Sequence, residues 1–269
     1  MSSLSCQTGS VQQTCKEQPA HSSRLKKFGH ALIRDDFLLE CQLLLLSFSI
    51  GIQDAASFPD YHCFASNQTG NTVLLAVGAA KLTTLFSLSN IGISLSMFVL
   101  GGFLPGQLGN YFGPRKRWWL MASSIIQTTL VFITVGIQYA GPSPVEDTGA
   151  HALAVISLLA FSSGAQVAMA RGLQITEITT AMATAAYVDI FIDKEMFALK
   201  NRRRNRRVAF LLSLFAGSFA GAFLYKARGS PFALIMSGVG KALVTISLVA
   251  NRDVREEEIH NGKKDGGIV

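Results

Sequence analysis

The sequence predicts an all-α polytopic membrane protein, and two observations support this fold class. Of the 269 residues, 49% are hydrophobic and only 15% are charged, whereas soluble domains have about 25% charged residues. The apolar residues are also gathered into long stretches without charge, at 82–114, 118–145, 152–170 and 208–225. Since about 18 to 20 such residues span a bilayer core as a helix, each stretch is long enough for one crossing.

The basic character of the chain does not point to nucleic acid. The net charge is +7, but the Lys and Arg residues lie in short blocks between apolar stretches, where the positive-inside rule places them in membrane proteins. We therefore expect no nucleic-acid partner. We also expect no enzyme activity, metal or cofactor, because the sequence has no hydrolase elbow, metal-spaced His pair or nucleotide fingerprint.

The domain organisation has three parts. Residues 1–36 are polar and rich in Ser and Gln, and we expect them to form a disordered cytosolic tail. Residues 37–251 carry the apolar segments and form the membrane domain. Residues 252–269 are charged and rich in Gly, which predicts a second disordered tail.

The first helix of the membrane domain is expected at 37–58. Pro59 predicts its end, because the residue before a proline is disfavoured in the α conformation. Asp54 then falls in the last turn of this helix. A carboxylate inside the bilayer costs about 2.5 to 3.5 kcal/mol on insertion scales, so such a group usually faces a cavity or a partner.

The second segment, 64–80, is short and unusually polar at its start. Thr69, Gly70 and Asn71 stand just before the apolar run VLLAVGAA, with Thr72 between them. This pattern resembles a helix that begins inside a membrane protein, with Thr or Asn as its cap and its free N–H groups aimed at whatever lies in front. An ordinary helix with a kink at Gly70 is the alternative.

The remaining segments follow the charge-free stretches. We expect helices at 87–107, 118–139, 150–170, 208–225 and 232–251. The segment 175–192 is again short and polar, because its charge-free part, 178–188, cannot span a bilayer. Ser213, Gly217 and Gly221 repeat every four residues, which predicts a stripe for helix packing. Gly217 and Gly221 are also a candidate contact for a homo-oligomer.

These eight segments can be threaded through a membrane in two ways. If all eight span, the basic block 115–117 lies on the opposite side from the N-terminus, and the acidic loop 145–151 lies on the same side. If 64–80 and 175–192 do not cross, the N-terminus, 115–117, the basic block 200–207 and the C-terminus all lie on one side. We favour the second arrangement, six spanning helices plus two short interrupted segments, because it follows the positive-inside rule except at Lys81, Lys226 and Arg228. Eight spanning helices are the alternative.

The six-span arrangement divides the membrane domain into two halves, about 37–139 and 150–251. Each half has a helix, a short polar segment and two further helices, and the halves start on opposite sides, which makes an inverted repeat. Gly51 and Gln53 in the first half parallel Gly164 and Gln166 in the second. Inverted repeats with interrupted segments are typical of secondary transporters, whose sites lie where the broken helices meet.

The pattern Gly51-x-x-Asp54-Ala55-x-x-Phe58, followed by Phe64 and Thr69-Gly70-Asn71, resembles the signature of a known family. This is the YoaK-like membrane protein family, built on domain of unknown function 1275, and the likeness covers most of 37–251. The second half matches in part: it has Gly164 and Gln166, but Val167 replaces the usual Asn, and Ala183-Thr184 follows Thr179-Thr180-Ala181-Met182 where Thr-Gly is usual. The resemblance implies a membrane protein and no particular substrate.

Candidate site residues come from the two short segments and their neighbours. Asp54 is a candidate proton carrier or cation ligand, since burial favours proton uptake by a carboxylate; a residue that caps or pairs at the helix end is the alternative. Polar groups of the first short segment are candidates for substrate or ion binding, and a structural turn is their alternative. The predicted binding residues are Asp54, Thr69, Gly70, Asn71, Gln166, Thr179 and Thr180.

Lys241 stands near the middle of the last apolar segment. An unpaired ammonium inside a bilayer is costly, so we expect Lys241 to pair with Asp54 or Asp189 across the bundle. The alternative is that its long side chain reaches an interface.

From these observations we predict a multi-pass integral membrane protein that transports a small solute. Proton coupling through Asp54 is one version of this hypothesis, and a non-transporting membrane scaffold or assembly factor is the alternative function. The lipid bilayer and an unidentified small solute are the expected partners. We expect both termini in the cytosol and, by default, the plasma membrane as the location.

Overall fold

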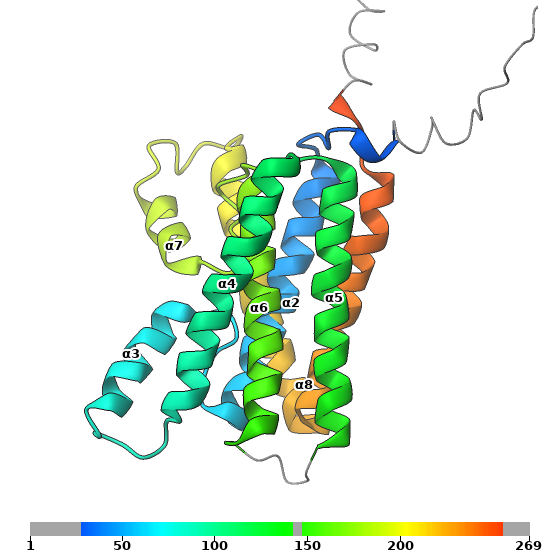
Figure 1. Cartoon of the computed structure of the whole chain (residues 1–269). Helices are drawn as coiled ribbons and strands as arrows, with labels where there is room; N and C mark the ends of the chain where they lie inside the picture. Colours follow the sequence, from blue (N-terminus) through cyan, green and yellow to red (C-terminus); the bar gives the residue numbers. More distant parts are fainter. Residues whose placement is uncertain (1–27, 142–146, 255–269) are drawn as a thin grey trace, which may run out of the picture.

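The computed structural model describes residues 28–141 and 147–254, which form a bundle of helices (Figure 1). The helices are α2 (Phe37–Tyr61), α3 (Gln68–Ala79), α4 (Leu88–Phe112), α5 (Arg117–Ala140), α6 (Ala150–Gly172), α7 (Ala183–Phe191), α8 (Arg202–Ser247) and the 3-10 helix η1 (Leu248–Ala250). Within the described ranges the only β-type pairing is two isolated bridges. The all-α prediction is confirmed.

The starts of α2 and α8 are fixed by side-chain caps. Asp36 accepts a hydrogen bond from the Leu39 N–H at 2.9 Å, and Asn201 accepts one from the Arg204 N–H at 3.0 Å. Such side chains satisfy N–H groups that have no partner within the helix. The predicted start at 37 is therefore confirmed, and α8 begins six residues earlier than the apolar pattern indicates.

The predicted end of the first helix before Pro59 is wrong. Helix α2 includes Pro59 and continues to Tyr61. The proline ring removes one N–H donor from the helix. Because only two residues of α2 follow Pro59, this loss does not end the helix earlier. His62 closes it in the left-handed conformation, with φ 53°, and its N–H donates to the Phe58 carbonyl at 2.9 Å.

Five of the described helices are long and apolar enough to cross a membrane: α2, α4, α5, α6 and α8 with η1. Helix α3 has 12 residues and α7 has nine, well below the roughly 20 that a crossing requires. The prediction that both polar segments are short is confirmed. The residues 175–182 before α7 are not helical.

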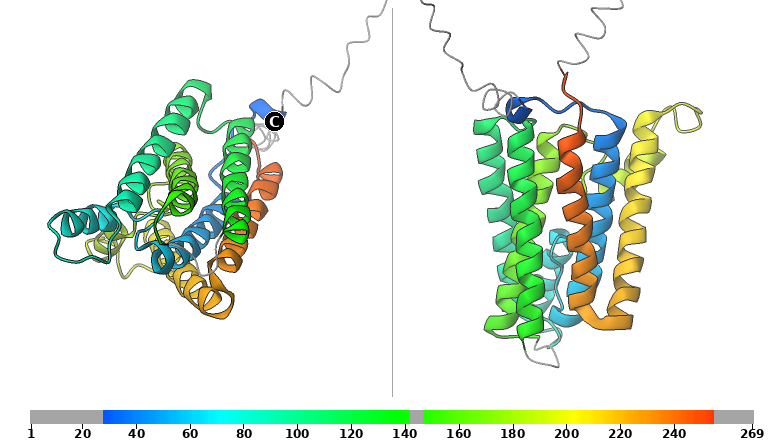
Figure 2. Two further views of the ribbon diagram at one scale, coloured as in Figure 1. Left: turned by 60° about the horizontal axis from the view of Figure 1, so that its bottom comes forward. Right: turned by 90° about the vertical axis from the view of Figure 1, so that its right-hand side faces the viewer.

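Helix α8 consists of two helical parts joined at a sharp turn. Gly229 has φ 79° and ψ 175°, outside the helical region, and Pro231 follows. Glycine adopts such positive φ values without the steric cost that other residues carry. Figure 2 shows the parts before and after this turn running in opposite directions.

One end of the bundle gathers the segments that flank the membrane domain. The Ile33 N–H donates to the Arg115 carbonyl at 3.0 Å, and the Val254 N–H donates to the Leu32 carbonyl at 3.1 Å. The start of α8 lies at the same end, since Arg202 pairs with Glu40 at 2.5 Å. Residues 28–36 and 252–254, which the sequence places in the tails, are thus held against the bundle; the rest of both tails lies outside the described residues.

The opposite end is tied together by Asn90 and Gln138. The Asn90 side chain donates to the Tyr61 carbonyl at 3.2 Å and to the Asp147 carbonyl at 2.6 Å. The Gln138 amide donates to the Ser230 hydroxyl at 3.2 Å. The end of α2, the start of α4, the α5–α6 connection and the turn at Gly229 therefore lie at one end.

The first part of α8 packs against α2 through glycines. A Cβ at Gly217 would collide with the backbone of Phe48, and a Cβ at Gly221 would lie 2.7 Å from the Ile52 Cα. Both glycines are buried. The predicted helix-packing stripe is confirmed, but its proposed role in a homo-oligomer is wrong, because α2 of the same chain occupies this surface.

Helices α4 and α6 make a matching contact. A Cβ at Gly164 of α6 would collide with the Phe98 carbonyl of α4, and a Cβ at Gly101 would collide with the Phe161 carbonyl. Phe161 precedes Gly164 by the same three residues that separate Phe48 from Gly51. The contact between α2 and α8 and the contact between α4 and α6 thus use glycines at the same spacing.

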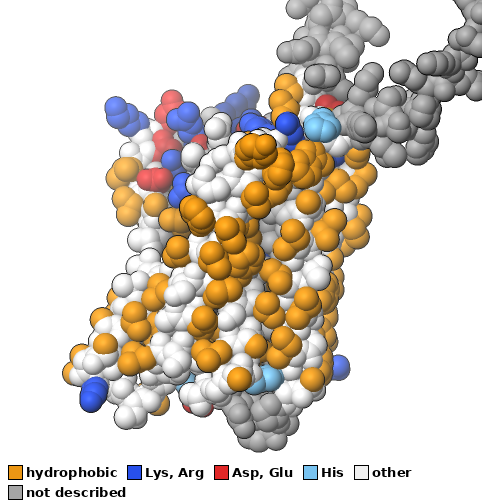
Figure 3. All heavy atoms as spheres, in the orientation of Figure 1, with side chains coloured by type: hydrophobic (Ala, Val, Ile, Leu, Met, Phe, Trp, Pro, Cys, Tyr) orange, Lys and Arg blue, Asp and Glu red, His pale blue; other side chains and the backbone are white. Residues whose placement is uncertain are grey.

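The outer surface of the bundle is largely apolar along its length, whereas charged side chains concentrate at the end that holds the tails (Figure 3). On the first part of α8, Leu212, Phe215, Phe219 and Phe223 are all more than half exposed. Large exposed apolar surfaces are unusual on soluble monomers. The helices therefore indicate contact with a lipid bilayer.

Candidate functional site

Polar side chains from four helices meet inside the bundle, about midway between its ends. Ser49, Gln127 and Ser162 each lie near the middle of their helix. We call the group the central polar cluster, and all its members are buried: Ser49, Gln53, Gln127, Ser162, Ser163, Gln166, Ser237 and Lys241.

Lys241 carries the charge of this cluster. Its side chain is 1% exposed, and its ammonium donates a hydrogen bond to the Ser162 hydroxyl at 3.2 Å. The alternative that this side chain reaches an interface is therefore wrong. An ammonium held this far from solvent is costly unless a counter-charge accompanies it.

The charge partners predicted for Lys241 are bound elsewhere. Asp54 accepts hydrogen bonds from Ser66, and Asp189 pairs with Arg207 at 3.4 Å. None of the ion pairs found among the described residues includes Lys241. The expected pairing across the bundle is therefore not found.

Hydrogen bonds connect α2, α6 and α8 beside Lys241. The Gln53 amide donates to the Ser237 hydroxyl at 2.8 Å, and Ser237 donates to the Ser49 carbonyl at 2.9 Å. The Ser163 hydroxyl donates to the side-chain Oε1 of Gln53 at 3.3 Å. Gln53 thus joins the first half of the chain to two helices of the second.

Gln166 lies one helical turn beyond Ser162. Its amide nitrogen donates to the Leu46 carbonyl at 3.2 Å, while its Oε1 is buried without a hydrogen-bond partner. A buried polar atom without a partner costs about 1 to 3 kcal/mol. Gln166 is thus buried inside the bundle, and its role in substrate or ion binding stays a prediction.

Asp54 secures the connection between α2 and α3. Its two carboxylate oxygens accept hydrogen bonds from the Ser66 N–H at 2.8 Å and the Ser66 hydroxyl at 2.5 Å. Ser66 is buried, and it precedes the N-cap of α3. The arrangement agrees with the alternative reading, in which Asp54 pairs near the end of its helix.

Asn71 is the structural centre of the first short segment. Its Oδ1 accepts from the Phe64 N–H at 2.9 Å, and its Nδ2 donates to the Phe64 carbonyl at 2.8 Å. It also donates to the Ser94 hydroxyl of α4 at 3.1 Å. Asn71 is fully buried, so its contacts fold the segment back against α4.

Thr69 and Gly70 do not share the buried contacts of Asn71. Thr69 is exposed, and a Cβ at Gly70 would lie 3.1 Å from the Phe64 ring. The N-cap is Asn67, which accepts from the Gly70 N–H at 3.2 Å. A helix start with a polar cap is confirmed, but neither predicted capping residue provides it.

The second short segment begins with a tight turn. Thr179 accepts from the Met182 N–H at 3.2 Å and donates to the Met182 carbonyl at 2.9 Å. Thr180 is fully buried in the left-handed region at φ 62°, and its hydroxyl has no hydrogen-bond partner. The structure gives Thr179 a part in the turn and shows no contact from either threonine to the central polar cluster.

The basic block at the start of α8 forms an ion-pair network. Arg206 pairs with Asp35 at 2.6 Å and with Glu40 at 2.8 Å, and it approaches Glu177 at 3.6 Å. In the loop before α8, the Glu195 N–H and the Asn201 amide donate to Asp193 and lower the pKa of its carboxyl. The network holds the α6–α7 connection against α2 and α8.

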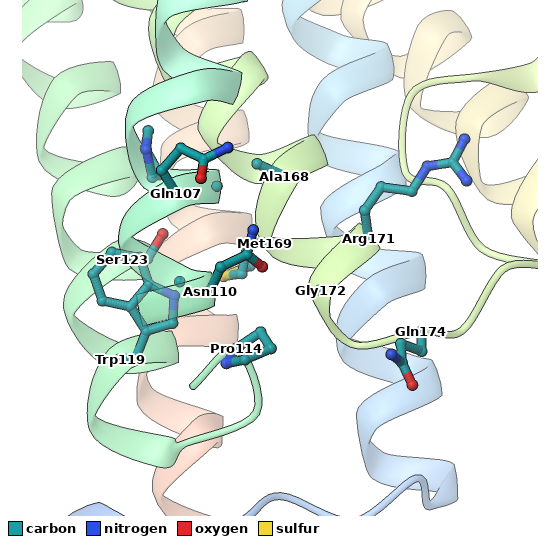
Figure 4. A pocket seen from close by; sticks show the side chains of 13 residues that line it. Gln107, Asn110, Pro114, Trp119, Ser123, Ala168, Met169, Arg171, Gly172 and Gln174 are labelled. Carbon is teal, nitrogen blue, oxygen red and sulfur yellow. The ribbon is translucent and has the colours of Figure 1, made fainter. Parts of the chain in front are cut away.

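A cavity of about 360 Å³ opens between α4, α5 and α6 at this same end. Its polar wall includes Gln107, Asn110 and Ser123, while Arg171 extends away from them (Figure 4). Ser123 is also the acceptor for the Gln127 amide at 2.9 Å. The cavity wall therefore contacts the central polar cluster directly.

Several members of the cluster escaped prediction from the sequence. Ser49, Gln53 and Ser237 carry no charge and stand within apolar runs, where uncharged polar residues are common. A signal did exist, since Ser49 and Gln53 lie four residues apart, as do Ser237 and Lys241. This spacing puts each pair on one face of a helix.

Comparison with known proteins places the chain in a family. The model of the family described as "Protein of unknown function (DUF1275)" matches residues 42–247. The match covers most of the chain, so the chain belongs to that family. The matched range contains the central polar cluster and both short segments. No curated protein and no solved structure matches the chain.

Proposed function

We propose that this protein is a transporter of a small solute, with its translocation route through the central polar cluster. The observation that carries this proposal is Lys241, a buried charged residue among polar groups in the middle of a membrane-length bundle. Ionisable residues at such a depth commonly mark substrate or ion pathways. The protein acts without covalent chemistry on its solute.

Six crossings account for the architecture. Four are α2, α4, α5 and α6, and the parts of α8 on either side of Gly229 supply two more. The backbone bonds of Ile33 to Arg115 and of Val254 to Leu32 support this count, because they bring both tails and the α4–α5 turn to one end. Short helices α3 and α7 enter without crossing.

The two halves are inverted copies of each other. Support comes from the glycine contacts, since Gly51 meets the backbone around Leu214 and Ser218 just as Gly164 meets that around Phe98 and Gly102. The spacing is the same in both pairs. Alternating access in such folds commonly proceeds by movement of one repeat against the other around a fixed site.

The end that holds the tails faces the cytosol, and the plasma membrane is the default location. The basic blocks 115–117 and 202–207 lie at this end, as the positive-inside rule requires of cytosolic segments. Proton coupling through Asp54 would operate through Ser66, because protonation of the carboxylate weakens the bonds that hold the α2–α3 connection.

The scaffold alternative lacks the free surface that it requires. It relied on the glycine stripe of Gly217 and Gly221 as a surface for partner helices. In the structure that stripe is covered by Phe48 and Ile52 of the same chain.

Proteoliposome flux tests the transport function. Reconstituted protein should move at least one solute from a panel of small anions, cations and neutral molecules, and Lys241→Met should abolish that flux. Lys226→Met is the matched control. Lys226 is also on α8, but it is exposed and lies just before the turn at Gly229. Absence of flux for every solute in the panel, in the wild type and in both lysine variants alike, would overturn the proposal.

A further inference from the structure

We propose that the solute is a small oxyanion, held at the Lys241 ammonium between α6 and the second part of α8. This inference rests on the proposed transport function and names the chemical class of its substrate. A short carboxylate or bicarbonate has the required size and charge. The ammonium would donate to an anion oxygen, while the neutral polar groups around it would orient the rest.

The charge balance of the bundle interior favours an anion. Lys241 is 1% exposed. The two carboxylates that the sequence suggested as its charge partners are bound elsewhere, Asp54 to Ser66 and Asp189 to Arg207. The other members of the central polar cluster are uncharged Ser and Gln. A cation entering this region would be repelled, whereas an anion would supply the counter-charge that a buried ammonium requires.

Hydrogen-bonding capacity at the site agrees with this assignment. An ammonium has three donors, and the described protein groups engage one of them, through Ser162. Gln166, on the same face of α6 one turn away, has a buried oxygen without a partner. The site therefore offers donors to anion oxygens, together with an acceptor for a hydroxyl such as that of bicarbonate.

The cavity between α4, α5 and α6 provides access from the basic end. Ser123 in its wall accepts from the Gln127 amide at 2.9 Å, and the Gln127 carbonyl accepts from Ser162 at 3.1 Å. Ser162 in turn accepts from Lys241. Polar groups thus lead from the cavity to the ammonium, and basic residues around the cavity end raise the local concentration of anions.

Anion binding to the purified full-length protein tests the inference. Thermal unfolding in detergent would be followed against formate, acetate and bicarbonate, with gluconate maintaining ionic strength. The wild type should show a saturable rise in unfolding temperature with at least one of these anions, because a ligand that binds only the folded state stabilises it. Lys241→Met should weaken binding about thirtyfold or more, as expected for removing one partner of a buried charge pair.

Lys226→Met should behave like the wild type in this assay. Equal shifts in the wild type and Lys241→Met, or no saturable shift with any of the three anions, would overturn the anion site. If Lys241→Met does not fold, the wild type decides alone. Saturable rises in unfolding temperature with formate or bicarbonate, and none with methylammonium chloride, support the site. A saturable rise with methylammonium chloride and none with formate or bicarbonate overturns it.

Flux in proteoliposomes separates this inference from the transport function. Saturable anion binding that depends on Lys241, with no flux of any solute, overturns transport and leaves the anion site standing. Flux of a neutral or cationic solute, with no anion binding, overturns the anion site and leaves transport standing.

Discussion

The ammonium of Lys241 donates to the hydroxyl of Ser162 at 3.2 Å, across the interface of α8 and α6 in the middle of the bundle. This bond joins two helices of the second half beside Gln53, which belongs to the first. A lysine that has only a hydroxyl for a protein partner contributes little stability, because a hydroxyl does not offset the cost of burying the charge. A buried ammonium of this kind more often belongs to a functional site than to a structural one.

Lys241→Met should raise the thermal stability of the protein in detergent without added anion. Replacing buried charges by apolar side chains of similar volume is often neutral or stabilising by about 1 to 4 kcal/mol. The measurement is the unfolding temperature, with Lys226→Met as the exposed control. A large loss of stability in Lys241→Met would show that the ammonium has a structural role, contrary to this expectation.

Gly217→Ala and Gly101→Ala should both destabilise the bundle. In each case the added methyl group would collide with a backbone carbonyl, that of Phe48 or that of Phe161, and overpacking of this kind costs about 1 to 3 kcal/mol. Unfolding temperature again provides the measure. Equal losses at the two positions are expected if the two helix pairs are equivalent.

Gly92→Ala and Gly136→Ala are the matched controls for these variants. A Cβ at either position meets no atom within 4 Å, and alanine is favoured over glycine in a helix interior by about 1 kcal/mol. Both controls should leave stability unchanged or raise it. Destabilisation of the controls to the same degree would remove the steric explanation.

The fold was largely predictable because charge-free runs directly mark apolar helices. The inward face of each helix was harder to predict. Gly102 and Gly106 have the four-residue spacing of a close helix contact, and both face α6. The tightest approach is nevertheless at Gly101, where a Cβ would collide with the Phe161 carbonyl. In α4 apolar residues surround the helix, so composition does not distinguish the buried face from the lipid-facing one.

The candidate site was predictable only in part, for a related reason. Lys241 stands out in the sequence as a lysine within a long apolar run. Its contact with Ser162 joins helices that are far apart in sequence, and Ser is common in membrane helices. Asp54 stood out equally well, but its partner Ser66 lies in a connection whose path depends on Pro59 and His62 rather than on any periodic pattern.

Asn71→Ala should loosen the α3 region, whereas Thr69→Ala should not. Removal of the Asn71 side chain leaves the Phe64 N–H without its partner, while the Phe64 carbonyl keeps only the hydrogen bond from the Ser94 hydroxyl. A buried polar group left unpaired costs about 1 to 3 kcal/mol. Thr69 is exposed, so its truncation serves as the control. Hydrogen exchange at the Phe64 amide measures the difference, and equal exchange in both variants contradicts the structural role of Asn71.

Asp54→Ala should expose Cys63 to thiol reagents. Cys63 is buried in the connection that Asp54 holds through Ser66. In a Cys6→Ser, Cys15→Ser background, the Cys63 modification rate should rise several-fold, while exposed Cys41 reacts at an unchanged rate. Asp54→Asn should give a smaller increase, because an amide oxygen still accepts one bond from Ser66. An unchanged Cys63 rate in both variants would show that Ser66 does not depend on Asp54.

Single cysteines at Lys116, Thr148 and Asn205 should establish the six-crossing topology. The α4–α5 turn at Lys116 and the start of α8 near Asn205 lie at the end that holds the tails, whereas Thr148 lies beside Asp147 at the opposite end. In a cysteine-free background in sealed vesicles, an impermeant thiol reagent should therefore label Lys116→Cys and Asn205→Cys from one side and Thr148→Cys from the other. Labelling of Lys116→Cys from the side opposite to Asn205→Cys would require an odd number of crossings between them. The inverted repeat, and with it the main architectural support for transport, would then be lost.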